Sequence, residues 1–175
     1  VDGLNYAHEQ GVIHRDGKPG NGRMLEDGRV KIMDFGIAKL KDHKSSLTRT
    51  GTTVGTAAYL PPEQIRGEPT DHRADIFSFG VMAYELLAYQ RPFDALTLAA
   101  LLYKILGNEP QPLVAVWPEA PERLASLVHS CLEKDPERRS QSFAAVASEL
   151  AAVRAVLSGD WGEESQSATN AAAVD

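Results

Sequence analysis

The chain has 175 residues, 43% of them hydrophobic and 24% charged, and its 24 acidic and 18 basic side chains give a formal net charge of −6. This length is that of about one domain with a sizeable core, and the composition is that of a globular protein. The acidic balance argues against a nucleic-acid-binding protein. No apolar run is long enough to span a bilayer, and no signal-peptide pattern opens the chain.

The single cysteine, Cys131, excludes an internal disulfide framework. It falls on the apolar face of an expected helix, so we expect a buried structural thiol and a reducing compartment, the cytoplasm. Because the chain begins at Val1 and not at Met, we expect it to be part of a longer protein, which segments outside this chain could anchor to a membrane.

In the first third of the chain, the sequence pattern predicts few helices and strands. Residues 3–10 have the pattern of a helix that stops before Gly11, and Val12-Ile13 predicts a short strand. Asp27-Gly28 is a typical hairpin turn and precedes a strand over 29–33. Residues 34–63 show no sustained periodicity, so we expect a long loop, which is usually functional in a compact domain.

The rest of the chain predicts helices. Residues 76–89 are apolar nearly all round, which indicates a helix buried at the centre of the domain. Asp94 is expected to cap a helix that runs to Leu106, and the prolines of 108–121 indicate a loop.

The last two helices have their own start signals. Pro121 is expected to begin a helix through Leu132, and Ser140 to cap the final one. Residues 158–175 are small, polar and acidic and predict a disordered tail, in which Trp161 would be exposed or loosely docked. The histidines show no metal-ligand spacing.

One stretch carries chemistry: His14-Arg15-Asp16, then Lys18 and Asn21, then Asp34-Phe35-Gly36. An acid, a cation, an amide and a second acid stand at the spacings that phosphoryl transfer requires. An ordinary Asp/Asn turn cluster is the alternative interpretation of these residue types. The Asp34-Phe35-Gly36 motif, which begins thirteen positions after Asn21, favours the catalytic interpretation.

Five motifs in this order resemble the C-terminal lobe of eukaryotic-type (Hanks-type) protein kinases: His14-Arg15-Asp16, Asp34-Phe35-Gly36, Pro61-Pro62-Glu63, Asp75 with Gly80, and Asp135-Pro136 with Arg139. Residues 46–64 are most similar to bacterial membrane-associated serine/threonine kinases. The resemblance implies an α+β, predominantly α fold over residues 1–157, with a short β-hairpin near the catalytic loop and the N-terminal lobe absent.

The resemblance also implies roles in catalysis. Asp16 would accept the proton of the attacking hydroxyl, and Lys18 would neutralise charge on the transferring phosphoryl group. Thr56 would bond to both and shape the hydroxyl-acceptor site. Asn21 and Asp34 would hold Mg²⁺ against the phosphates of ATP.

A second set of residues would act in regulation and structure. Arg15 would receive a phosphate from the activation segment, with Thr48 and Thr50 as the phosphorylated residues, and self-association could serve this phosphorylation. A solvated polar loop is the alternative interpretation of those threonines. The structural assignments are His14 and Phe35 in the hydrophobic regulatory stack, Gly36 closing the second motif, Glu63 paired with Arg139, and Asp75 holding the backbone of His14 and Arg15.

Three positions depart from the family pattern. Gly17 and Gly22 replace large apolar anchors, each typically worth about 2–5 kcal/mol, and glycine adds roughly 0.5–1 kcal/mol of backbone entropy. Arg23 stands where the family has the apolar floor under adenine, so its guanidinium would swing out or block the base. The sequence also has no glycine-rich phosphate loop, strand lysine or partner glutamate.

The expected function is therefore that of a serine/threonine protein kinase, which transfers the γ-phosphate of ATP to Ser or Thr of protein substrates. We expect the isolated chain to be inactive without the N-terminal lobe. The first alternative is a non-catalytic kinase-like scaffold, favoured by Gly17, Gly22 and Arg23. The second is a small-molecule phosphotransferase, which the motif at Pro61-Pro62-Glu63 argues against.

Overall fold

The computed structural model describes residues 1–35 and 54–158. Its first element, α1 (Asp2–Glu9), buries Leu4 and Ala7 and is followed by Gly11 in the left-handed region, at φ 74°. The expected helix is thus confirmed. The expected strand at Val12-Ile13 is wrong, because Val12 N donates to Ala7 O (2.9 Å) and so bonds back to α1 instead of to a neighbouring strand.

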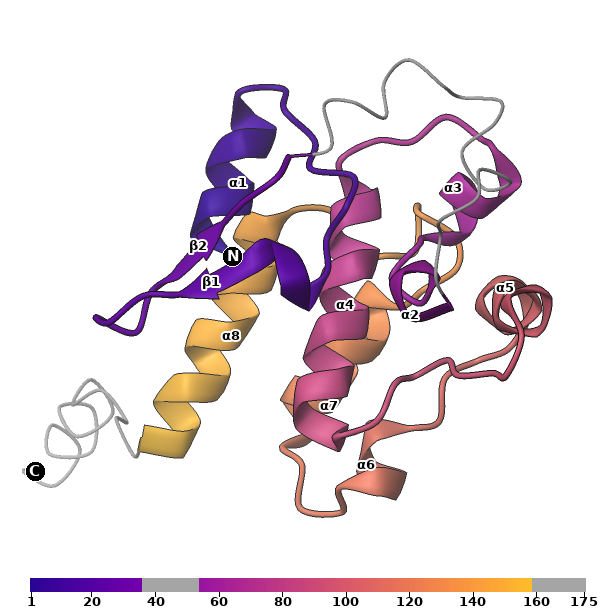
Figure 1. Cartoon of the computed structure of the whole chain (residues 1–175). Coiled ribbons are helices and arrows are strands. Elements are labelled where there is room, and N and C mark those ends of the chain that lie inside the picture. Colours follow the sequence, from indigo (N-terminus) through magenta and orange to yellow (C-terminus); the bar gives the residue numbers. More distant parts are fainter. Residues whose placement is uncertain (36–53, 159–175) are drawn as a thin grey trace, which may run out of the picture.

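A small hairpin follows the predicted catalytic loop (residues 14–21), as expected. A single 3₁₀ turn, η1 (Pro19–Asn21), leads into β1 (Gly22–Met24), which pairs antiparallel with β2 (Val30–Ile32). Gly28 takes φ 81° at the turn, the conformation in which a glycine meets no steric cost. The hairpin lies across the front of α1 and α8 in Figure 1, and Ile32 packs against the apolar cluster that those helices share.

Seven helices make up the rest of the described chain: α2 (Val54–Ala57), α3 (Pro62–Arg66), α4 (Arg73–Ala88), α5 (Leu98–Gly107), α6 (Leu113–Val116), α7 (Glu122–Cys131) and α8 (Phe143–Ser158). Helix α4 stands at the centre of the molecule (Figure 1). It buries residues on all sides, which confirms the prediction of a central helix. At Gly80 a Cβ atom would lie 2.8 Å from Cys131 Cβ, so glycine permits the close contact of α4 with α7.

The core has two parts, one on each side of α4. The larger lies between α4, α5 and α7 and includes Phe77, Val81, Leu101 and Ile105. The smaller joins α1, α4, α7 and α8 through Leu4, Ile76, Leu127, Cys131, Phe143 and Val146. Cys131 is fully buried, as expected, and burial raises the pKa of its thiol to about 11.

The helix starts differ in detail from the predictions. Thr97, not Asp94, caps α5, since Thr97 Oγ1 accepts a hydrogen bond from Ala100 N (3.3 Å). Ser142, not Ser140, lies at the start of α8, where its Oγ accepts from Ala145 N (3.1 Å). The short helix α6 interrupts the expected proline-rich loop.

The predicted fold class is confirmed: the described residues are mostly helical and contain one small two-stranded sheet. Within residues 1–35 and 54–158, no helix combines the length and the apolar character that crossing a membrane requires. The tail predicted after residue 158 lies outside the described residues.

Candidate active site

The catalytic loop brings three of the predicted catalytic side chains together. Lys18 Nζ lies 2.9 Å from Asp16 Oδ2, and Asn21 Nδ2 donates to the same oxygen (3.0 Å) and to Asp16 O (2.7 Å). The Asp16 side chain is 18% exposed and Asn21 is buried. An ammonium group and an amide donor therefore fix the orientation of a carboxylate that still reaches solvent, the arrangement that a base for an incoming hydroxyl requires.

Asp75 at the start of α4 holds this loop from below. Its Oδ2 accepts from His14 N (2.7 Å) and its Oδ1 accepts from Arg15 N (2.8 Å). Its carboxylate is only 2% exposed, so these backbone bonds are shielded from water. Arg15 takes φ 62°, a backbone conformation that costs a non-glycine residue free energy and persists only where its surroundings impose it.

His8 is a further contact of Asp75 that the sequence reasoning missed. His8 Nε2 donates to Asp75 Oδ2 (2.8 Å), and the His8 ring packs 5.3 Å from that of Phe143 on α8. His8 has no metal-ligand spacing, so the sequence indicates only a surface or packing role for it. Its place in the last turn of α1, directly before the catalytic loop, was the available signal.

The second acidic motif is tied to the loop by backbone bonds. His14 Nε2 donates to Met33 O (2.9 Å), Met33 N donates to Asn21 O (2.8 Å), and the His14 and Phe35 rings lie 4.7 Å apart. The structure thus brings His14 and Phe35 into contact, as the stack requires. Asp34, between Met33 and Phe35, is exposed and takes φ 55°. Gly36 lies outside the described residues.

Asn21 and Asp34 are suited to Mg²⁺ by chemistry. Magnesium prefers oxygen ligands and binds through one or two protein groups together with waters and substrate phosphates. The backbone bond from Met33 N to Asn21 O joins the two segments that carry the amide and the exposed carboxylate. In the described part of the chain no three His, Cys, Asp or Glu side chains gather into a group that could hold a metal ion.

Of the residues predicted to bind or carry the regulatory phosphate, the structure describes only Arg15. Arg15 is half-buried, and within residues 1–35 and 54–158 its buried Nε makes no hydrogen bond. Thr48 and Thr50 lie outside the described residues. Thr56 lies in α2, and its predicted bonds to Asp16 and Lys18 stay a prediction.

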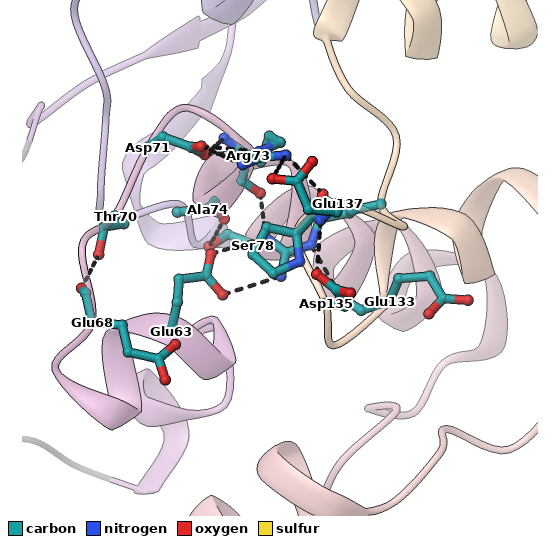
Figure 2. Close-up of polar contacts among 12 residues, drawn as sticks. Glu63, Glu68, Thr70, Asp71, Arg73, Ala74, Ser78, Glu133, Asp135 and Glu137 are labelled. Carbon is teal, nitrogen blue, oxygen red and sulfur yellow. Dashed lines mark hydrogen bonds and ion pairs between the residues drawn. The ribbon is translucent and has the colours of Figure 1, made fainter.

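Below the site, Glu63 of α3 and Arg139 form a buried ion pair. Arg139 Nη1 and Nη2 donate to the two carboxylate oxygens at 2.9 and 3.1 Å, and the two side chains are 0% and 4% exposed. Figure 2 shows Arg73 between Asp71 and Glu137, with ion pairs of 2.8 and 3.0 Å, and Arg139 Nη1 also donates to Arg73 O (2.6 Å). This polar network joins α3 and the start of α4 to the segment before α8.

The glycines of the loop change how it packs. A Cβ atom on Gly17 would lie 2.9 Å from Ser78 Cβ, so the backbone lies closer to α4 than a side chain would allow. A Cβ on Gly22 would meet only ordinary contacts. Both glycines line an apolar cavity of about 580 Å³ beneath the loop. Of the two glycines, only Gly22 therefore leaves room for a side chain without displacing a neighbour.

Arg23 does not enter this cavity. Its neighbours on β1, Gly22 and Met24, line the cavity, so the alternation of the strand directs Arg23 to the opposite face. Arg23 is exposed and pairs across the hairpin with Lys31. The guanidinium therefore reaches solvent, and its effect on nucleotide binding stays a prediction.

The sequence of the chain matches a known protein family. The model of the protein kinase domain matches residues 1–151. The chain belongs to the protein kinase domain family. The match extends from α1 into α8, and thus includes the loop, the second acidic motif and the buried ion pair.

Individual relatives of this kinase chain are bacterial. It is 41% identical over 143 residues to a probable serine/threonine-protein kinase of Streptomyces coelicolor. The aligned segment covers 81% of this chain and 21% of that relative. It is 39% identical over 148 residues to the serine/threonine-protein kinase PknB of Mycolicibacterium smegmatis. Here the aligned segment covers 84% of this chain and 24% of that protein. A probable serine/threonine-protein kinase of Clostridium acetobutylicum is 39% identical over 151 residues. The chain thus spans about a quarter or less of the length of these relatives, and it is related to bacterial Hanks-type kinases.

Proposed function

We propose that this kinase chain supplies the catalytic loop and the protein-substrate side of a serine/threonine protein kinase, which transfers the γ-phosphate of ATP to Ser or Thr hydroxyls. The observation that carries the proposal is the arrangement of Asp16, held on one carboxylate oxygen by Lys18 at 2.9 Å and Asn21 at 3.0 Å. The curated relatives, printed as serine/threonine kinases, support the reaction class.

In this proposal each residue has a physical task. Asp16 orients the substrate hydroxyl and accepts its proton, while Lys18 offsets the negative charge that grows on the transferred group. Asn21 and Asp34 would hold Mg²⁺, which neutralises the phosphate charge when bound. Thr56 would shape the hydroxyl-acceptor site. Since catalysis in protein kinases also needs the lysine–glutamate pair of the other lobe, the 175-residue chain by itself would be inactive.

Regulation follows the same proposal. Arg15 would pair with a phosphate on Thr48 or Thr50, because its buried Nε makes no hydrogen bond within the described residues. A phosphate adds nearly two negative charges and orders a loop through such a pair. The partners would be the N-terminal lobe, Ser/Thr-containing protein substrates and a second kinase molecule for phosphorylation of the activation segment. The cytoplasm would supply ATP and keep Cys131 reduced.

A kinase assay on the full-length protein that contains this chain tests the proposal. With Mg·ATP and a general protein substrate, we expect phosphoserine or phosphothreonine. Asp16→Asn should lower kcat by about 10²–10⁴-fold with little change in KM for ATP. Asp94→Asn, in the loop before α5, is the matched control and should leave kcat unchanged. Transfer that persists in Asp16→Asn would refute the assignment of the base.

A non-catalytic scaffold is the second candidate, and Arg23 is the observation that favours it. Arg23 is exposed on β1, on the face of the hairpin opposite the cavity. In the full-length protein, Arg23→Leu should tighten Mg·ATP binding if the guanidinium impedes the adenine, and Lys31→Leu is the control for loss of a cation on the same hairpin. Micromolar ATP affinity of the unsubstituted protein would exclude the blocked-floor scaffold.

A further inference from the structure

Helix α6 is short and begins among prolines, so little in its own sequence holds it. It spans Leu113–Val116 and starts at Pro112, which provides no side-chain cap. An isolated helix of this length is not stable in water, and the first N–H groups of a helix have no partner within it. Helix α6 therefore depends on its contacts with the core helices α4 and α7, and Figure 1 shows it near the C-terminal end of α4.

Two hydrogen bonds tie the start of α6 to those helices. Tyr84 of α4, which is fully buried, donates from its hydroxyl to Gln111 O (2.9 Å). Leu113 N donates to Nε2 of His129, in the last turn of α7, at 2.9 Å. The rings of His129 and Tyr84 also meet edge-on, with their centroids 6.3 Å apart. Because Leu113 is fully buried in the larger core, the bond from Leu113 to His129 holds this part of the core closed.

The bond to Leu113 fixes the protonation state of the imidazole. A backbone N–H can only donate, so Nε2 of His129 must present a lone pair, and the ring is neutral with its hydrogen on Nδ1. Protonation of Nε2 would set two N–H groups against each other and break the bond. His72 is the contrasting case: its Nε2 faces Gln141 O (2.9 Å), a carbonyl that accepts from the neutral or the charged ring.

The surroundings of His129 favour the neutral ring. Burial lowers the pKa of His129 below its ordinary value, and the carboxylate of Glu109, in the segment before α6, opposes this shift. Tyr84 stays uncharged, because burial raises the pKa of its phenol. Further charged groups on the elements around α7 are held in contacts of their own: Lys134 over the ring of Phe93 (3.7 Å to the centroid), and the pairs Arg123–Glu149 (2.7 Å), Glu85–Arg91 (3.1 Å) and Glu133–Arg138 (3.7 Å). Among the described residues, Glu109 is thus the charge that acts on the imidazole.

We propose that the bond between His129 and Leu113 is a pH-sensitive latch, which holds α6 on the core while the ring is neutral and releases it when the ring is protonated. In the open form His129 binds a proton near the ordinary pKa of about 6.5, whereas the closed form binds one only at lower pH. The latch is therefore closed above about pH 6.5 and opens as the pH falls through that value. The proposal does not rest on phosphate transfer, because it concerns packing alone.

Amide hydrogen exchange of the full-length protein that contains this chain tests the latch. Peptides that cover residues 111–117 are followed by mass spectrometry at about pH 7.5 and about pH 5.5, and each exchange rate is divided by the intrinsic rate at that pH. If only the open form binds the proton, the equilibrium constant for opening rises about tenfold between these two pH values. Peptides from α5 should change little. His129→Gln keeps an acceptor oxygen but cannot titrate, so the rise should disappear. His129→Phe removes the acceptor as well, so exchange should be raised equally at both pH values.

His72→Gln is the matched control. It removes another histidine, whose hydrogen bond to a carbonyl survives protonation, so the rise at residues 111–117 should remain. Circular dichroism at both pH values shows whether each variant is folded. The ring ¹⁵N shifts of the unsubstituted protein give a second readout that needs no variant, because the hydrogen of His129 should lie on Nδ1 at about pH 7.5.

Four results would overturn the proposal. The first is an opening of residues 111–117 that does not change with pH. The second is a rise that persists in His129→Gln, which would assign the proton to another group. The third is an equal rise in the peptides of α5, which would mean that the whole domain opens. The fourth is a His129 hydrogen on Nε2 in the folded protein, because that nitrogen could not then accept from Leu113 N.

Discussion

Removing one partner of the buried Glu63–Arg139 pair should destabilise the fold more than removing both. Glu63→Met deletes two hydrogen bonds of 2.9 and 3.1 Å and leaves the guanidinium of Arg139, whose side chain is 0% exposed, without its counterion. Breaking a buried pair in this way costs about 3–5 kcal/mol. Arg139 keeps its bonds to Glu133 O (3.1 Å) and Arg73 O (2.6 Å), so we expect the lower end of that range.

A loss of about 3 kcal/mol raises the unfolding equilibrium constant more than a hundredfold, since about 1.4 kcal/mol is tenfold. It is also a large fraction of the roughly 5–15 kcal/mol that stabilises a typical domain. In the double variant Glu63→Met/Arg139→Met both charges are gone and the remaining groups are apolar. Because the desolvation of the ion pair is then no longer required, the double variant should be more stable than Glu63→Met alone.

Urea unfolding of the 175-residue chain, followed by far-ultraviolet circular dichroism, measures these differences. Glu149→Gln is the control: Glu149 pairs with Arg123 at 2.7 Å, but both side chains are about half exposed and the substitution should change the midpoint little. The reasoning fails if Glu63→Met shifts the midpoint no more than Glu149→Gln does, or if the double variant is less stable than the single one.

Three further predictions concern single groups. Asp75→Asn should raise amide hydrogen exchange in the catalytic loop, because the amide keeps one acceptor oxygen and its NH2 group cannot accept the second of the two backbone bonds, whereas Asp94→Asn should not; equal exchange in both would contradict the anchoring role. Burial lowers the pKa of Lys134 to about 8, so the unfolded chain binds more protons between about pH 8 and 10 and the unfolding free energy should rise with pH there. That slope should be absent in Lys134→Met, measured by urea unfolding at each pH, and an unchanged slope would refute the assignment. Cys131, with its raised pKa and full burial, should react with iodoacetamide at pH 8 only in urea; prompt alkylation of the folded chain would show that the thiol is accessible.

The sequence predicted those elements that depend on local patterns. The apolar character of residues 76–89 identified the central helix, and the Asp27-Gly28 turn identified the hairpin, because periodicity and turn chemistry are local. Helix starts were less reliable, since Asp94 and Thr97 are both good caps and packing decides between them. Helix α6 lies among prolines, and it is held in part by the bond from Leu113 N to His129 Nε2 (2.9 Å), a contact sixteen residues away that no local pattern reports.

For the candidate site, the motifs predicted which side chains meet but not what supports them. The ring contact of His14 and Phe35 and the bonds from Asp75 to the loop follow the expected pattern. The contribution of His8 depends on how α1 packs against α4, which is a tertiary property. The cavity under Gly17 and Gly22 depends on the relative positions of four elements, which no local pattern reports.

The distribution of backbone conformations in the catalytic loop gives a guide for engineering it. Arg15 and Asp34 have positive φ, where glycine would be conformationally cheapest, whereas Gly17, Gly20 and Gly22 do not. Glycine at 15 or 34 would relax the backbone, and alanine at 20, where a Cβ meets no atom within 4 Å, would reduce the entropy of the unfolded chain. The two positions with a strained backbone therefore carry side chains, whereas three positions without positive φ are glycine. A more stable version of this loop would therefore be reached first through position 20, where no proposed catalytic or regulatory side chain is lost.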